Sequence, residues 1–304
     1  MNNSNVTPSD ERSAIPRSFI IATLILAALF SVPLFRLARF AAGSELYSHI
    51  NLIPFISAFL VWLNRRTLPP PSAPMPAAVS GLFFLFGVTV LGIWGFFAWS
   101  RPQLALENSL AASTLSFLLF FWSICGRFFG KNTLRSLLFP LCFLVFMVPF
   151  PTFVRHALET GLQYSSAQAA FAIIKLSGTP VFFQDGLVFQ LPGFSMQVAP
   201  ECSGIHSTLA LFITSVLAGH FFLRTPWKSA VFALAVIPLG ILRNGFRVFV
   251  IGELCVRIGP HMVDSPIHRR GGPLFFVLSL IPLFLLLYFL VRSERRTARS
   301  TAKG

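Results

Sequence analysis

One cysteine stands where a polar segment meets a long apolar run. Cys202 lies within Pro-Glu-Cys-Ser-Gly-Ile-His-Ser, at 200–207, and we expect it in the first turn of a helix over 203–223. A thiol attacks a carbonyl only as a thiolate, which helix N-terminal amides and the positive end of the helix dipole stabilise. The position therefore predicts a nucleophile at a membrane surface. Its polar neighbours, which disfavour an inert core cysteine, are Glu201, Ser203, Gly204 and Ser207.

Histidines that could serve as the base follow and precede this thiol. His268 stands just before Gly271-Gly272-Pro273, which opens the last apolar run. As a general base it would take the thiol proton and later protonate a leaving amine. His206 is a rival, because a residue at i+4 from Cys202 shares its helix face. His261 and His49 are weaker rivals. For each of these histidines, the alternative is a solvated loop residue with no catalytic role.

Two arginines lie one helical turn apart near the end of another apolar run. Arg243 and Arg247 share a helix face, and Asn244 adds polarity beside them. Ionisable groups within a membrane segment are costly and usually functional. A guanidinium there would stabilise a thiolate, bind the oxyanion of a tetrahedral intermediate or hold a substrate carboxylate. The alternative is a pair of interfacial arginines that reach toward lipid phosphates.

The composition predicts a helical membrane protein. The chain has 304 residues, 55% of them hydrophobic and 11% charged, against about 25% charged in a soluble domain. A net charge of +14 would suit nucleic-acid binding in a soluble protein, but basic loops anchor topology in a membrane protein, so we expect no nucleic-acid partner. The four cysteines show no metal-binding spacing, and no nucleotide-binding loop is present, so we expect no metal and no cofactor.

Apolar runs near the length of a membrane span recur along the chain and predict about eight transmembrane helices in one bundle. The mixed segment 152–176 predicts an external amphipathic helix at the interface, with another span as the alternative. Residues 179–198, which alternate around Asp185-Gly186, predict a short β-hairpin outside the membrane, between spans five and six. The predicted spans are 18–35, 46–63, 78–99, 109–125, 134–150, 203–223, 228–250 and 272–292.

The predicted fold class is thus an all-α polytopic membrane protein with one domain. We expect a disordered cytoplasmic N-terminus at 1–17, a single transmembrane catalytic domain at 18–292, and a basic cytoplasmic tail at 293–304. With both ends inside, most Lys and Arg of the short loops fall on the inner side, as membrane insertion favours. The same topology places the cysteine, both arginines and His268 on the external face. No feature of the sequence indicates an oligomeric state.

Three motifs in this order, each at the outer end of a span, resemble the exosortase/archaeosortase family of integral membrane cysteine transpeptidases. They are Glu201-Cys202-Ser203-Gly204-x-x-Ser207, Asn244-x-x-Arg247 and His268-x-x-x-Gly272. Earlier stretches agree with the family as well, including Tyr47-Ser48-His49 and Val148-Pro149-Phe150-Pro151. The resemblance runs over residues 45–290 and implies a catalytic set of Cys202, Arg247 and His268.

The resemblance also implies supporting residues, an activity, a location and partners. Supporting or substrate-binding residues would be Glu201, Ser203, Gly204, Ser207, Arg243, Asn244 and Gly272. The activity implied is that of a peptidase or transpeptidase at the periplasmic face of the bacterial inner membrane. Its partners would be membrane lipids and exported proteins with a C-terminal signal, namely a short motif such as Pro-Glu-Pro (PEP-CTERM), a transmembrane helix and a basic cluster. Many such systems accompany exopolysaccharide production.

Other functions stay open at this point. A polymerase, ligase or flippase of a polysaccharide pathway would also use external arginines on anionic lipid-linked sugars, but Cys202 would then be dispensable. A transporter would place its polar groups near the middle of the bilayer, whereas these clusters lie at span ends. A disulfide between Cys202 and Cys255 would argue against a free nucleophile.

Overall fold

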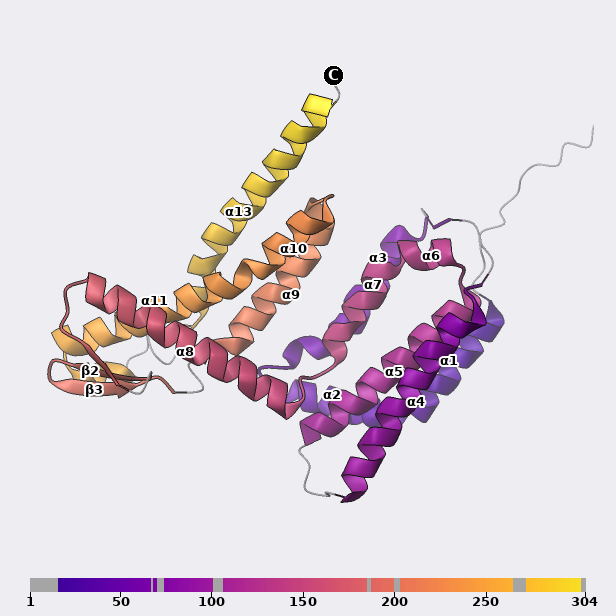
Figure 1. Ribbon diagram of the computed structural model, residues 1–304, viewed down its shortest axis with the longest axis horizontal. Coiled ribbons are helices and arrows are strands. Elements are labelled where there is room, and N and C mark those ends of the chain that lie inside the picture. The colour runs from indigo at the N-terminus through magenta and orange to yellow at the C-terminus, as the bar shows by residue number, and fades with distance from the viewer. Residues whose placement is uncertain are drawn as a thin grey trace, which may run out of the picture. The chain divides into compact units, whose positions relative to one another are not determined.

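The computed structural model forms two compact units, Met1–Thr152 and Phe153–Gly304 (Figure 1). It describes residues 16–66, 68–69, 74–100, 106–184, 187–199, 203–264 and 272–301, with backbone only at 263–264 and 297–301.

Over the described residues, the regular elements of the first unit are all helices, and the longest of them, α4 and α5, pack along each other. Gly87 of α4 permits this approach, because a Cβ there would lie 2.8 Å from the ring of Phe120 on α5. Ser123 Oγ also donates a hydrogen bond to the carbonyl of Ser80 at 2.8 Å. The elements are α1 (Arg17–Leu29), α2 (Ser31–Ala42), η1 (Ser48–Asn51), α3 (Ile53–Asn64), α4 (Ala77–Ser100), α5 (Leu106–Phe128), α6 (Lys131–Ser136), α7 (Leu138–Phe143) and η2 (Leu144–Met147).

The second unit combines long helices with a small antiparallel sheet of order β1-β2-β3 (Figure 1). Phe183 pairs with Phe189, and Phe189 pairs with Met196, so the register is continuous across the three strands. The predicted hairpin is confirmed as β1 and β2, and β3 extends it. The elements are α8 (Thr152–Leu176), β1 (Phe182–Gln184), β2 (Val188–Leu191), β3 (Phe194–Gln197), α9 (Ile205–Phe222), α10 (Pro226–Leu234), α11 (Val236–Arg257), η4 (Pro260–Asp264) and α13 (Gly272–Thr301).

Three of the helix breaks fall four residues before a proline. In a helix, the carbonyl of each residue accepts a hydrogen bond from the N–H four positions later. Proline has no N–H to donate, and its ring clashes with that carbonyl. The residue pairs are Leu29 and Pro33, Ser136 and Pro140, and Leu234 and Pro238. A proline also begins the short helix α3, at Pro54, whereas Pro282 lies inside α13 without ending it.

The described residues contain between five and seven candidate spans, where eight were predicted. Five helical stretches are long and apolar enough to cross a membrane, and two bent pairs would each add one span. The helix α3 has 12 residues, about 18 Å at 1.5 Å per residue, which is short of a bilayer core of about 30 Å. The apolar runs were therefore found correctly, but the prolines divide some of them. The structure is that of a multi-pass membrane protein.

Two glycines of α11, Gly240 and Gly245, let neighbouring helices approach this central helix closely. A Cβ on Gly240 would lie 2.6 Å from Oγ1 of Thr208 on α9, and one on Gly245 would lie 2.8 Å from Cβ of Ala169 on α8. On Gly252 it would meet Leu191 of β2 at 3.4 Å, an ordinary contact. Small residues at these contacts allow close helix packing, as is common in membrane bundles.

The sheet rests on α8 and α11 through a hydrophobic core that includes Ile174, Phe189 and Val248. The helical stretch Pro226–Arg257 has 32 residues, about 48 Å at 1.5 Å per residue, so it is longer than the bilayer core of about 30 Å. The last turns of α11 support the sheet through the hydrophobic core.

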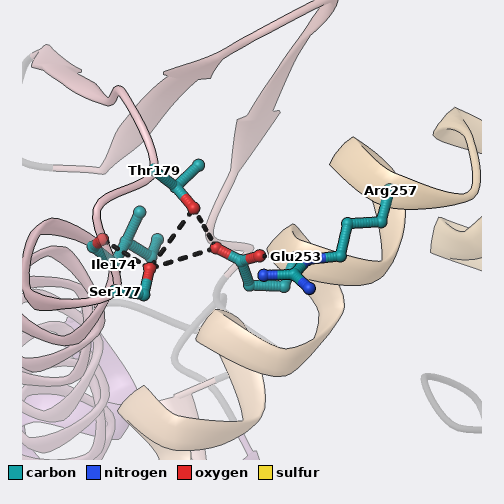
Figure 2. A network of polar contacts seen from close by, with 5 residues as sticks. All are labelled: Ile174, Ser177, Thr179, Glu253 and Arg257. Atoms are coloured by element: carbon teal, nitrogen blue, oxygen red, sulfur yellow. Dashed lines mark hydrogen bonds and ion pairs between the residues drawn. The ribbon is translucent and has the colours of Figure 1, made fainter.

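Polar contacts join the ends of α8 and α11, as Figure 2 shows. Thr179 Oγ1 and Ser177 Oγ both donate to Oε1 of Glu253, the latter at 3.2 Å. Arg257 Nε donates to the other carboxylate oxygen at 2.9 Å, and Ser177 Oγ also bonds the carbonyl of Ile174 at 2.7 Å. The carboxylate thus holds the loop that leads from α8 into the sheet.

At the opposite end of the second unit, α13 caps α10. The Glu294 carboxylate accepts hydrogen bonds from the backbone N–H groups of Arg224 and Thr225 at 3.0 and 2.9 Å. A carboxylate at a helix N-terminus satisfies free amides and complements the helix dipole. The buried Lys228 donates to Ser293 Oγ at 2.8 Å and ties the same two helices together.

Candidate functional site

The start of α9 is held by Arg243 of α11. Arg243 Nη2 donates to Ser207 Oγ at 2.6 Å and lies 3.5 Å from both the Gly204 carbonyl and Thr208 Oγ1. Hydrogen bonds from a charged donor are stronger than those between neutral groups. The first turn of one membrane helix is thereby fixed to the middle of another.

Gly204 is the N-cap of α9 and has a φ of +72°, in the left-handed region that glycine adopts most easily. A Cβ at this position would lie 3.2 Å from Arg243 Nη2 and 3.3 Å from Cγ of Asn244. Asn244 and Ser203 are both 3% exposed, so polar groups are enclosed on each side of the turn. The glycine therefore permits the close approach that brings the first two motifs together.

The start of α13 reaches the same part of α11. The ring of Phe275 packs edge-on against that of Phe246, with centroids 6.2 Å apart. Phe246 stands between Arg243 and Arg247 in the sequence, and Phe275 follows Gly272, the first residue of α13, by three positions. The helix that begins at the last residue of the third motif thus contacts the helix that carries the second.

The segment that leads from β3 to α9 is anchored at its other end by α8. Gln163 Nε2, in a side chain only 7% exposed, donates to the carbonyl of Val198 at 2.6 Å. The N–H of Val198 bonds the carbonyl of Leu187 at 3.0 Å. Residues on both sides of the predicted nucleophile are therefore fixed, by Gln163 upstream and by Arg243 downstream.

The structure brings together five predicted site residues: Ser203, Gly204, Ser207, Arg243 and Asn244. Arg247 lies one turn beyond Arg243 on the same side of α11 and is partly buried. Gly272 is exposed at the first position of α13. The remaining predicted residues, Glu201, Cys202 and His268, lie outside the described residues.

His206 lies in the first turn of α9, which begins at Ile205 after the left-handed Gly204. The helix face that His206 was expected to share with Cys202 required a regular helix through positions 202–206, and Gly204 interrupts it. His206 is exposed. At about 100° per residue, its side of α9 is roughly opposite to the side on which Ser207 and Thr208 contact Arg243. Cys202 itself lies outside the described residues, so its place beside the first turn of α9 stays a prediction.

Three residues that contribute to the site were not predicted from the sequence. Gln163, Thr208 and Phe275 contact motif residues or their neighbours, and none carries a motif signature. Gln163 could have been singled out as a polar residue on the apolar face of its helix, but its partner is a backbone carbonyl. A backbone partner leaves no trace in the sequence, so only the structure identifies this contact.

The electrostatics of the site are those of two adjacent cations at a helix junction. Arg243 and Arg247, one turn apart on α11, favour an anion beside them, whether a thiolate, an oxyanion or a substrate carboxylate. Within the described ranges, no group of three or more His, Cys, Asp or Glu side chains is arranged to hold a metal ion.

The fold and the site define a class, namely multi-pass helical membrane proteins with polar motifs gathered where helices begin. Comparison with family models gives a match to the transmembrane exosortases over residues 34–285. The match covers more than half of the chain, and the protein therefore belongs to the transmembrane exosortase family. No curated protein and no solved structure matches it.

Proposed function

We propose that this protein is a cysteine transpeptidase or peptidase that cleaves C-terminal sorting signals of exported proteins at the outer face of the bacterial inner membrane. One observation carries the proposal. Described residues from or beside all three motifs meet around one stretch of α11, at Ser207, Arg243 and the Phe246–Phe275 contact. Because the chain positions of Cys202 and His268 are close to these contacts, a common site for both is supported.

In the proposed reaction, a substrate helix enters the membrane beside the bundle and presents its signal motif at the outer interface. The Cys202 thiolate attacks the scissile carbonyl, and the carbon–nitrogen bond breaks as His268 protonates the departing amine. The resulting thioester is released by a second nucleophile, either water or an amine. Arg247 stabilises the thiolate or the oxyanion of the tetrahedral intermediates.

We assign Arg243 a positioning role rather than a catalytic one. Its Nη2 donates to Ser207 and lies near two further oxygens of α9, so this group holds the start of that helix in place. Arg247, one turn away, is the arginine assigned to the reacting groups. Both charges would favour an acidic residue in the signal motif, as in Pro-Glu-Pro, and a link to exopolysaccharide-associated sorting is part of the proposal.

The test is co-expression with a tagged substrate that carries a candidate C-terminal signal, followed on a gel. We expect a mass shift with the wild type that is lost with Cys202→Ala, Arg247→Ala and His268→Ala. Cys142→Ala is the matched control, since that exposed cysteine lies on α7 in the first unit, and it should process normally. Processing by Cys202→Ala would overturn the assignment of the nucleophile and favour the polysaccharide alternative. If His206→Gln lost substrate processing while His268→Ala kept it, the role of the base would pass from His268 to His206.

A further inference from the structure

A groove beside the C-terminal half of α13 lies apart from the proposed reaction. It has a volume of about 700 Å³, within the range of about 300–1,000 Å³ typical of ligand pockets. Its apolar wall is formed by Phe222 of α9 with Phe284, Leu287 and Val291 of α13. These residues belong to two candidate membrane spans, so the wall faces a region that lipid chains can reach.

The mouth of this groove is strongly basic. Arg292, Arg295 and Arg296 lie along it, and their i, i+3 and i+4 spacing places them on one side of α13. In the part of the chain that the structure describes, no carboxylate lies within ion-pair distance of these three groups. The adjacent acidic residue, Glu294, is already engaged by the N–H groups of Arg224 and Thr225. Three positive charges are therefore left to face the groove.

We propose that this groove binds one anionic phospholipid. The planar guanidinium groups match phosphate oxygens with paired hydrogen bonds, and an acyl chain would lie along the wall formed by Leu287 and Val291. Basic pockets between membrane helices bind anionic headgroups in this way. The Tyr288 hydroxyl, 3.4 Å from Arg292 Nη1, adds a polar group at the same level. The charge at the mouth also disfavours a basic peptide segment there.

The experiment uses the full-length protein, purified and delipidated in a zwitterionic detergent. Native mass spectrometry compares phosphatidylglycerol with phosphatidylcholine of the same acyl chains. Each arginine near an anionic lipid contributes about fivefold in affinity, so we expect phosphatidylglycerol to bind at least about tenfold more tightly. Substitution of all three arginines by Gln should abolish this preference. The control is Arg65→Gln with Arg66→Gln, a basic pair at the end of α3, which should keep it.

A second pair of variants separates the groove from simple charge attraction. Leu287→Trp fills the apolar wall without any change of charge and should weaken binding of phosphatidylglycerol. Leu285→Trp, at an exposed position of the same helix that does not line the groove, should not. The proposal would be overturned if both Trp variants bound phosphatidylglycerol equally well. It would also be overturned if the Arg65/Arg66 control lost the preference for phosphatidylglycerol as fully as the triple Gln variant. Displacement of the lipid by excess inorganic phosphate would overturn it as well, in favour of a soluble phosphate site.

Discussion

Arg243 and Arg247 are equivalent by residue type and by position on one helix face, but the contacts of Arg243 give it a positioning role. Arg243 contacts the first turn of α9, where Ser207 Oγ lies at 2.6 Å and two further oxygens lie at 3.5 Å. A Lys ammonium at position 243 would keep the charge but would lose the planar fork that reaches several acceptors. The two arginines should therefore respond differently to the same substitution.

We expect Arg243→Lys to lower the free energy of unfolding by about 1.5–3 kcal/mol, the range for a lost hydrogen bond to a charged group. Arg247→Lys should reduce substrate processing, because Arg247 is assigned to the reacting groups. Thermal or chemical unfolding in detergent measures the first effect, and the gel assay measures the second.

The contact between Arg243 and Ser207 can be isolated by a double-mutant cycle. Because Ser207→Ala removes the same hydrogen bond, its combination with Arg243→Lys should cost less than the sum of the single changes. Full additivity of the two changes would show that the contact contributes nothing to stability, and the positioning role would have to be abandoned.

At the scale of elements, α11 organises the second unit because it carries glycines where other elements approach. Gly245 faces the backbone of α8, with Ala170 N at 3.0 Å and the carbonyl of Ser166 at 3.1 Å from a Cβ at that position. Backbone atoms cannot rotate away as a side chain can, so any added methyl group forces the helices apart. Such a shift would move Arg243 and Arg247 relative to α8 and its Gln163.

Gly245→Ala is accordingly expected to destabilise the protein by about 1–3 kcal/mol, as overpacking of a core does. Gly252→Ala on the same helix is the control, because its nearest contact would be a Leu191 methyl group at 3.4 Å, an ordinary distance. Unfolding midpoints in one detergent compare the two variants. Similar midpoints for both would show that α8 and α11 do not need to lie this close.

At the scale of the whole molecule, the spans of the second unit determine which residues share a face of the membrane. One candidate span, α9, separates the sheet from the loop at Arg224. The sheet and that loop must then lie on opposite sides. The distribution of basic residues further predicts that the sheet is external.

Cysteine labelling tests this arrangement. In a background without native cysteines, Gln197→Cys should react with a membrane-impermeant maleimide in intact spheroplasts. Arg224→Cys should react only after permeabilisation; both positions are exposed. Labelling of both from the outside would show that α9 does not cross the membrane. The reverse pattern would preserve the fold but place the candidate site on the cytoplasmic face.

Much of this molecule was predictable from local patterns along the chain. Runs of apolar residues near 20 long must form helices in lipid, because no water is present to satisfy the backbone. The helix over 152–176 and the paired strands around Asp185-Gly186 followed from periodicity, and α8, β1 and β2 confirm them. The span count was less predictable, since prolines such as Pro33 and Pro140 divide apolar runs that composition alone treats as continuous.

By itself, the sequence determined the membrane class, the family and the residue types of the motifs, because these depend on composition and local order. Only the tertiary structure decided that Arg243 engages the start of α9, that Gln163 holds Val198, and that Phe275 reaches Phe246. These contacts join residues distant in the chain, and they depend on how closely helices approach at Gly204, Gly240 and Gly245. Close approach is a property of packed surfaces, which no local pattern encodes.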